Sequence, residues 1–288
     1  MKLKIGSRES RLAVRQAELL MESIRAAYPE IGLELVTMKT TGDKILNRTL
    51  DKIGGKGLFV KELETALLEG HVDLTVHSCK DLPMEEDPAL PLAAFSVRED
   101  PRDVLVLPAG VEELDLSGPI GCSSRRRQLQ LRALYPTARV EPVRGNVQTR
   151  LDKLDSGQFS ALVLAAAGLK RLGLENRISR YFSVEEILPA AGQGILAVQC
   201  RAGTDTYYLR AFDNAAGRAC AAAERAFVRV LDGGCSSPVA AYAEVSGDGL
   251  HLWGMDTAGR VGEMTGAVTE AVRLGEKLGQ AMLRGKTQ

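Results

Sequence analysis

The feature that most constrains the fold is an alternation of short apolar strands and amphipathic helices, which begins at the N-terminus. Apolar residues recur at helical spacing from Ala13 to Ala27, and Ser10 precedes them as a candidate helix cap. Strands are predicted at residues 2–6, 33–38 and 72–77, and helices at residues 10–27 and 60–69. This order is typical of βαβ units in a largely parallel sheet.

The alternation starts again after Pro101 and predicts a second α/β domain. A helix in this part begins at Ser123 or Ser124, and another spans residues 146–156. Strands are predicted at residues 103–107, 120–122, 139–143 and 161–165. Residues 196–200 form a further apolar strand that could belong to either domain.

The last part of the chain changes its pattern. A long helix over residues 215–231 is followed by strands at 239–245, 250–256 and 262–268, and a helix over 269–283 closes the chain. Strands that follow one another through Gly-containing turns indicate a small antiparallel sheet. The predicted fold is therefore two α/β domains and a small α+β domain.

Composition excludes several classes of protein. The 288 residues carry equal numbers of basic and acidic side chains, so overall charge does not favour a polyanion-binding role. The N-terminal segment is too polar for a signal peptide, and no apolar run is long enough to span a membrane. Five widely spaced cysteines predict reduced thiols in a cytoplasmic protein, and three histidines show no metal-ligand spacing.

Arginines gather where three predicted strands end and helices begin. The three segments are residues 7–11 (SRESR), 122–127 (CSSRRR) and 144–150 (RGNVQTR). Helix N-termini and guanidinium groups both bind anions, and ligands of open α/β sheets sit at the carboxyl ends of strands. The pattern predicts a cleft for a ligand with several negative groups, although each cluster alone also fits a solvated helix start.

Three further segments are candidates for chemistry. Asp81 follows a strand at the same edge as the arginines, where it could stabilise a cation, move a proton or be an ordinary turn residue. Cys235 lies in a Gly-Gly-Cys turn and fits either an accessible nucleophile or a structural cysteine. Gln193 lies between two glycines, a pattern that favours a hinge over a phosphate-binding loop.

Together these segments resemble the porphobilinogen deaminase family. The similar segments are residues 54–62 (GGKGLFVKE), 77–81 (HSCKD), 144–150 (RGNVQTR), 165–171 (AAAGLKR) and 233–235 (GGC). They occur in the family's order and extend from the first domain to the last. The resemblance therefore covers nearly the whole chain.

The resemblance implies a transferase of tetrapyrrole biosynthesis. Members of the family join four porphobilinogens head to tail, release ammonia at each step, and hydrolyse the product to hydroxymethylbilane. Their primer is a dipyrromethane cofactor bound as a thioether to the cysteine that matches Cys235. Each porphobilinogen carries two carboxylates, which accounts for the arginine clusters. We expect a cytoplasmic monomer that binds no nucleic acid, membrane or metal.

The resemblance also implies a role for individual residues. Asp81 matches the catalytic carboxylate, assisted by Lys80 and Arg8. The residues implied to bind the cofactor are Cys235, Ser10, Ser78, Lys80, Asp81, Ser123, Ser124, Arg126, Arg127, Arg144, Gly145, Arg150, Arg171 and Gln193. The residues implied to bind substrate are Arg8, Ser10, Phe59, Arg144, Arg150 and Arg171.

The family fold implies domain boundaries. This sequence also departs from the family's usual residues at a few positions. Residues 1–97 and 194–213 would form domain 1, residues 98–193 domain 2, and residues 214–288 domain 3. The first two domains are expected to resemble type II periplasmic binding proteins. Cys122 stands where a threonine is usual and Arg125 where a leucine is commoner, so the paired role falls to Arg126 and Arg127.

Two other classes of function compete with this reading. A solute-binding protein of the periplasmic type would use the same α/β alternation and arginines, but it would not need the Gly-Gly-Cys turn of an added domain. A nucleic-acid-binding protein would use Arg125–Arg127 and Arg144–Arg150, yet zero net charge and 5% aromatic residues count against it. Reversible solute binding or salt-dependent retention of DNA or RNA would favour these alternatives.

Overall fold

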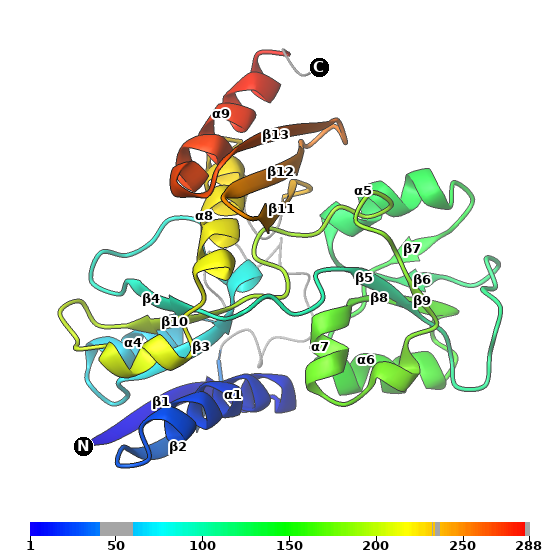
Figure 1. Ribbon diagram of the computed structural model, residues 1–288. Coiled ribbons are helices and arrows are strands. Elements are labelled where there is room, and N and C mark those ends of the chain that lie inside the picture. The colour runs from blue at the N-terminus through cyan, green and yellow to red at the C-terminus, as the bar shows by residue number, and fades with distance from the viewer. Residues whose placement is uncertain (41–59, 232, 234–236, 286–288) are drawn as a thin grey trace.

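The computed structural model describes residues 1–40, 60–231, 233 and 237–285. These residues form two α/β units, each built on a five-stranded sheet, and a third unit with a three-stranded sheet (Figure 1). The predicted fold class is thereby confirmed. Residues 41–59, between the strand predicted at 33–38 and the helix predicted at 60–69, lie outside the described residues.

The first sheet has the strand order β2-β1-β3-β10-β4. Its strands are β1 (Lys2–Arg8), β2 (Gly32–Met38), β3 (Leu74–Ser78), β4 (Leu92–Phe95) and β10 (Leu196–Cys200). β1 pairs in parallel with β2 and β3, whereas β10 runs antiparallel to β3 and β4. The described sheet is thus largely parallel, as expected, and β10 runs the other way because the chain enters that strand from the second unit rather than through a local βαβ crossover. The implied return of residues 196–200 to the first unit is confirmed.

The helices of this unit follow from their capping residues and apolar faces. α1 (Arg11–Ala27) begins at Ser10, whose hydroxyl accepts the Ala13 backbone N–H at 3.4 Å. Its predicted face is buried from Ala13 to Ile24, with Leu20 and Ile24 wholly enclosed, whereas Ala27 at the end of the helix is exposed. α4 (Lys61–Leu68) ends before Gly70, which has φ +73°, a conformation that favours glycine.

The second sheet repeats the same arrangement with the order β7-β6-β8-β5-β9. Its strands are β5 (Asp103–Val106), β6 (Ile120–Gly121), β7 (Val140–Glu141), β8 (Ala161–Ala165) and β9 (Arg180–Tyr181). The unit also contains α5 (Arg125–Leu134), α6 (Val147–Asp155) and α7 (Ala166–Arg171). The equivalent strands β5 and β10 both arrive from the other unit and both run antiparallel to their central neighbour.

The third unit packs two helices on one face of its sheet. It consists of α8 (Ala215–Val230), β11 (Ala240–Ser246), β12 (Gly249–Met255), β13 (Val261–Ala267) and α9 (Ala271–Leu283). The strands are antiparallel, as predicted, and lie in the order β11-β12-β13. The two helices cross closely at Gly275, where an added Cβ would lie 2.1 Å from the Ala223 carbonyl oxygen. The short 3₁₀ turns are η1 (Cys79–Asp81), η2 (Glu175–Arg177), η3 (Tyr207–Ala211) and η4 (Val268–Glu270).

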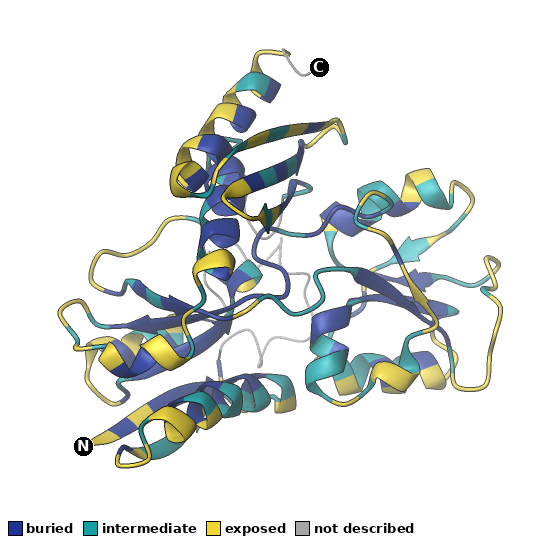
Figure 2. Cartoon of the chain, in the orientation of Figure 1, coloured by how far each residue is buried: buried dark blue, intermediate teal, exposed yellow. Residues whose placement is uncertain are grey.

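A buried carboxylate ties the three units together where the chain crosses between them. Glu224 of α8 accepts hydrogen bonds from the backbone N–H groups of Gly192 at 2.6 Å and Ala243 at 2.8 Å. It also forms an ion pair with Arg98, which lies on the connection from β4 to β5. Residues 187–195, on the second connection, are mostly buried, whereas residues 97–102, on the first, are half-buried or exposed (Figure 2). Within the described residues, no helix is long and apolar enough to cross a membrane.

Candidate active site

The three predicted arginine clusters all lie where a strand passes into a helix. They follow β1, β6 and β7 and lead into α1, α5 and α6. The first helical turns are capped by Ser10, Ser124 and Asn146, which accept backbone N–H groups at 3.4, 3.5 and 3.0 Å. The structure thus selects Ser124 over Ser123 as the cap of α5. Each junction presents a helix N-terminus beside arginine, as an anion site requires.

Asp103, the first residue of β5, is the charged centre of the second unit. Its side chain is completely buried, and Arg126 lies 2.8 Å from Oδ2. Arg127 donates to Oδ1 through Nε at 3.0 Å and Nη2 at 2.7 Å. Burial by itself would raise the pKa of the Asp103 carboxyl, but the two guanidinium groups hold it far below its usual range. Asp103 is therefore ionised at neutral pH.

Gln193 connects this charged centre to the first unit. Its side-chain amide donates to Asp103 Oδ1 at 2.9 Å and to the Pro101 carbonyl at 2.6 Å. Its amide oxygen accepts from Lys80 Nζ at 3.2 Å. Gln193 is completely buried, so these contacts are made away from bulk water. The residue predicted as part of a hinge thus links the side chains of both α/β units.

Lys80 and Asp81 lie together on η1, directly after β3. Burial, followed by the charge of Arg127, lowers the pKa of the Lys80 ammonium to about 8, although Asp81 and Asp103 oppose that shift. Asp81 is exposed, unlike Lys80, which is partly enclosed. A carboxylate that is open to a ligand and adjacent to a half-buried ammonium can stabilise a developing cation and exchange a proton.

Two further arginines are enclosed without the carboxylate that Arg126 and Arg127 share. Arg150 Nε donates to the Gly145 carbonyl at 2.8 Å, and Arg171 Nη2 donates to the Gly194 carbonyl at 2.6 Å. Burial is the largest cause that lowers the pKa of each guanidinium to about 10, and nearby Arg127 and Arg144 add to it at Arg150. Because these side chains remain charged at neutral pH, a ligand carboxylate would stabilise them.

The predicted serines have hydrogen bonds of their own. Ser78 Oγ accepts from Gln16 Nε2 at 3.0 Å. Ser123 Oγ donates to the Val143 carbonyl at 2.6 Å and accepts the Val143 N–H at 2.9 Å, which ties the β6–α5 junction to the segment after β7. These contacts position the junctions around the arginines. Arg8 ends β1, and Arg144 with Gly145, at φ +117°, precedes α6.

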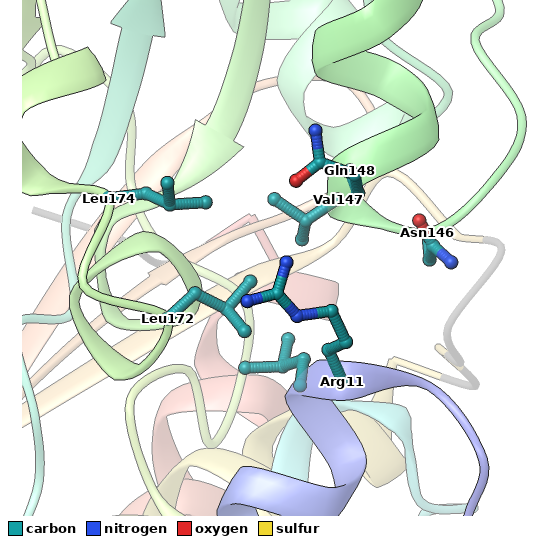
Figure 3. Close-up of a pocket in the computed structure, with 7 residues that line it drawn as sticks. Arg11, Asn146, Val147, Gln148, Leu172 and Leu174 are labelled. Carbon is teal, nitrogen blue, oxygen red and sulfur yellow. The ribbon is translucent and has the colours of Figure 1, made fainter.

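The wall of the site extends to a small pocket between α1 and the α6–α7 region (Figure 3). The Arg11 side chain extends from α1 toward Leu172 and Val147 of the second unit. Leu12 also meets this unit, because a Cβ at Gly168 would lie 3.6 Å from its Cδ2. The two α/β units therefore touch on the side of α1 as well as through the crossing connections.

Two sequence-predicted residues, Cys235 and Phe59, lie outside the described residues. Conversely, Asp103, which pairs with two predicted arginines, was not among the residues predicted from the sequence. A signal was present, because an aspartate opens an otherwise wholly apolar buried strand. Such a charge needs a buried partner.

Among the described residues, no group of three or more histidine, cysteine, aspartate or glutamate side chains could hold a metal ion.

The arrangement defines a class of protein: an α/β protein with a basic site between two units that are joined by two crossing connections. Family comparison gives the particular group. Residues 3–208 match the model described as "Porphobilinogen deaminase, dipyromethane cofactor binding domain", and residues 218–284 match "Porphobilinogen deaminase, C-terminal domain". The chain belongs to the porphobilinogen deaminase family.

Curated relatives match over nearly their full length. The porphobilinogen deaminase of Acetivibrio thermocellus is 57% identical over 289 residues, covering 99% of each chain. That of Alkaliphilus oremlandii is 58% identical over 281 residues, covering 97% of this chain and 94% of the relative. The resemblance on which the sequence analysis relied is confirmed, together with the assignment to a family of transferases that has a dipyrromethane cofactor domain.

Solved structures match part of the chain at low identity and low TM-score. The effector-binding domain of BenM with benzoate is 16% identical, with a TM-score of 0.43 over 73% of this chain and 87% of that one. The periplasmic aliphatic sulphonate-binding protein SsuA of Escherichia coli is 14% identical, with a TM-score of 0.40 over 79% of this chain and 70% of that one.

Proposed function

We propose that this chain joins four porphobilinogens head to tail on a dipyrromethane primer, releases one ammonia at each step, and hydrolyses the product to hydroxymethylbilane. The observation that carries this proposal is the basic site between the α/β units, in which Asp81 lies exposed beside the half-buried cationic side chains of Lys80 and Arg150. Porphobilinogen has an acetate and a propionate, so a growing chain of such units adds two carboxylates at each step.

The donor groups of the site fit a dipyrromethane cofactor. Arg150 and Arg171 are enclosed, and the hydrogen bonds described for them end on backbone carbonyls. A carboxylate beside either guanidinium would offset the cost of burying its charge. We assign cofactor carboxylates to these two arginines, to Arg144 and to the Arg126–Arg127 pair, and the thioether to Cys235. When bound, the cofactor supplies a nucleophilic pyrrole carbon as the point of extension.

Asp81 is assigned the catalytic role. Loss of ammonia from porphobilinogen leaves a cationic pyrrole, and an exposed carboxylate next to it stabilises that charge electrostatically. The same carboxylate can take the proton that the new carbon–carbon bond releases. Lys80 provides a positive charge for a ligand carboxylate, and Arg8 and Ser10 at the end of β1 are assigned to the incoming substrate, with Phe59 beside its ring.

The proposal includes the organisation of the chain. Sheet membership supports domain 1 at residues 1–97 and 194–213, domain 2 at 98–193 and domain 3 at 214–288, because β10 lies in the first sheet and β5–β9 in the second. Cys79, Cys122, Cys200 and Cys220 are buried free thiols, which fits a cytoplasmic protein. We propose that the protein acts as a monomer.

The test is an assay of the purified chain with porphobilinogen. Ammonia should appear in proportion to the porphobilinogen consumed, and the product should cyclise to a uroporphyrinogen that becomes coloured on oxidation. The Asp81→Asn variant should keep its cofactor but lose most turnover, because the amide has no charge to stabilise the cation. Asp152→Asn, on the exposed face of α6, is a control that should act like wild type. Consumption of no porphobilinogen by the wild-type chain would refute the proposal.

A further inference from the structure

Asp103 has no assigned role in the proposed reaction, although it lies beside residues that do. Its side chain has no exposed surface, so it does not meet the ligand directly. It nevertheless contacts both members of the arginine pair and the amide of Gln193. An ionised carboxylate in such surroundings costs free energy unless its partners are held in good geometry. Asp103 is therefore a buried charge whose free-energy cost is offset by the partners that it holds behind the site.

The contacts on one side fix the arginine pair. Arg127 is held by two hydrogen bonds to Asp103 Oδ1, and its remaining nitrogen donates to the Val163 carbonyl at 3.2 Å. Arg126 lies against Oδ2 and also donates to the Leu188 carbonyl at 2.6 Å. Two guanidinium groups and one carboxylate leave one net positive charge. The pair is thus matched to one further carboxylate rather than two.

The contacts on the other side reach Lys80. The Gln193 amide donates to Asp103 and accepts from Lys80, so its orientation is fixed by the acidic partner at one end and the basic partner at the other. A side-chain amide has one accepting and one donating end, and reversal would place two acceptors or two donors in contact. This linkage crosses from β5 of the second unit to η1 of the first.

We propose that Asp103 is a positioning residue for the reaction, acting through Arg127 on one side and Gln193 on the other. It aims the arginine pair at one ligand carboxylate and holds the Lys80 ammonium next to Asp81. The inference rests on the proposed function, because its readout is the condensation of porphobilinogen. It assigns to Asp103 no contact with substrate or cofactor.

The proposal predicts a change in pH dependence that simple loss of stability does not produce. The charged groups acting on Lys80 are Arg127 and Arg126 of α5, which favour its neutral form, and Asp81 and Asp103, which favour its charged form. Replacing Asp103 by a neutral residue removes one favourable charge. The Lys80 ammonium then loses its proton at a lower pH.

The experiment compares pH profiles of kcat/KM for wild type and Asp103→Asn. We expect kcat/KM to fall roughly ten- to hundredfold at neutral pH, the effect of losing a hydrogen bond to a charged group. We also expect the alkaline limb to move to lower pH. The matched control is Asp256→Asn, because Asp256 is also a buried aspartate paired with an arginine, Arg260, but lies in the β12–β13 turn. Asp256→Asn should lower the free energy of unfolding but leave the alkaline limb of the kcat/KM profile at the wild-type pH.

A second variant keeps the test decisive if Asp103→Asn does not fold. Gln193→Met removes the amide between Asp103 and Lys80 and leaves the arginine ion pairs in place. It should move the alkaline limb in the same direction with a smaller loss of kcat/KM. An unchanged limb in the folded variants would overturn the positioning role. Inactivity of the wild-type chain would instead refute the proposed function, so the two failures are distinguishable.

Discussion

Two buried carboxylates of the molecule, Asp103 and Glu224, have different partners and different roles. Neither has any exposed surface, and each pairs with arginine. Asp103 lies between two guanidinium groups and next to a side-chain amide. Glu224 has one guanidinium and two backbone N–H groups. Asp103 therefore organises side chains, whereas Glu224 organises the backbone at the junction of the three units.

The different partners shift the pKa values of the Asp103 and Glu224 carboxyls in opposite directions. The paired arginines outweigh burial at Asp103 and lower the pKa of its carboxyl. Burial dominates at Glu224 and raises its pKa, although Arg98 and the two N–H groups oppose the shift. The cost of burying a negative charge is thus more fully offset at Asp103, in the candidate site, than at Glu224, at the junction of the three units. A ligand-binding region can hold a dense group of charges when one buried anion serves two cations.

Residues 192–194 connect the two carboxylates. The Gly192 N–H donates to Glu224, and the Gln193 side chain donates to Asp103. The Gly194 carbonyl accepts from Arg171. A displacement of this short segment would therefore disturb the scaffold and the site together.

The largest effect on stability is expected from Glu224→Ala. The change leaves Arg98 and two backbone N–H groups buried without their acceptor. Removal of one partner of a buried ion pair costs about 3–5 kcal/mol. Urea unfolding should show this loss of free energy, and kcat per folded molecule should also fall, because the freed Gly192 N–H adjoins Gln193 of the site. A variant as stable as wild type would show that the scaffold carboxylate is dispensable.

The next effect is expected from Gly194→Ala. Gly194 has φ +87°, and an added Cβ would lie 2.2 Å from the Glu99 carbonyl oxygen. The control is Gly157→Ala, since Gly157 has a similar φ of +78° but no atom within 4 Å of the added Cβ. Because both variants share the backbone strain, their difference isolates the clash, which should cost about 1–3 kcal/mol more at Gly194. Equal unfolding free energies would contradict the close packing of this segment.

The opposite pKa shifts predict opposite changes in acid sensitivity. The folded state keeps Asp103 ionised to lower pH than the unfolded state does, so this group contributes stability that is lost as pH falls. Glu224 has a raised pKa, so the folded state takes up its proton first and this group contributes stability as pH falls. Each proton corresponds to a limiting slope of about 1.4 kcal/mol per pH unit.

Unfolding free energies between pH 6 and pH 3 would measure these slopes. Asp103→Asn should make the loss of stability on acidification shallower, because the neutral amide does not titrate. Glu224→Gln should make it steeper. Changes of the same sign in the two variants would refute the distinction between the carboxylates.

The smallest effect is expected from Glu22→Gln on the surface of α1. Glu22 pairs with Arg15, and both side chains are exposed. Exposed ion pairs contribute about 0–1 kcal/mol because water and salt screen them. The unfolding midpoint should hardly change, and the small difference should disappear at high salt. A loss as large as that of Glu224→Ala would show that burial does not set the strength of these pairs.

Much of the fold could be predicted from the sequence, because its signals are local. Ser10 and Asn146 cap the helices that their positions predicted, and the third sheet is antiparallel, as predicted. The short strands β4 and β9 and the helix α7 were missed, since four apolar residues, two residues and a six-residue turn of helix show no clear period.

The site was less predictable because its contacts are not local. The arginine clusters were recognised from their strand-to-helix junctions, but their shared partner Asp103 lies on another strand. Likewise, Gln193 was interpreted as part of a hinge and, from the resemblance, as a cofactor-binding residue, and nothing in its neighbourhood indicated that its amide joins Lys80 to Asp103. Pairings of this kind depend on the completed sheet topology.

The measurement that tests the central claim most directly is the intact mass of the chain from a host that makes porphobilinogen. The account predicts an increase equal to two linked pyrrole units, retained after denaturation and located by peptide mapping on Cys235. Cys235→Ala should lack the increase. An unmodified wild-type chain that stays unmodified with porphobilinogen, or an adduct on another cysteine, would contradict the account.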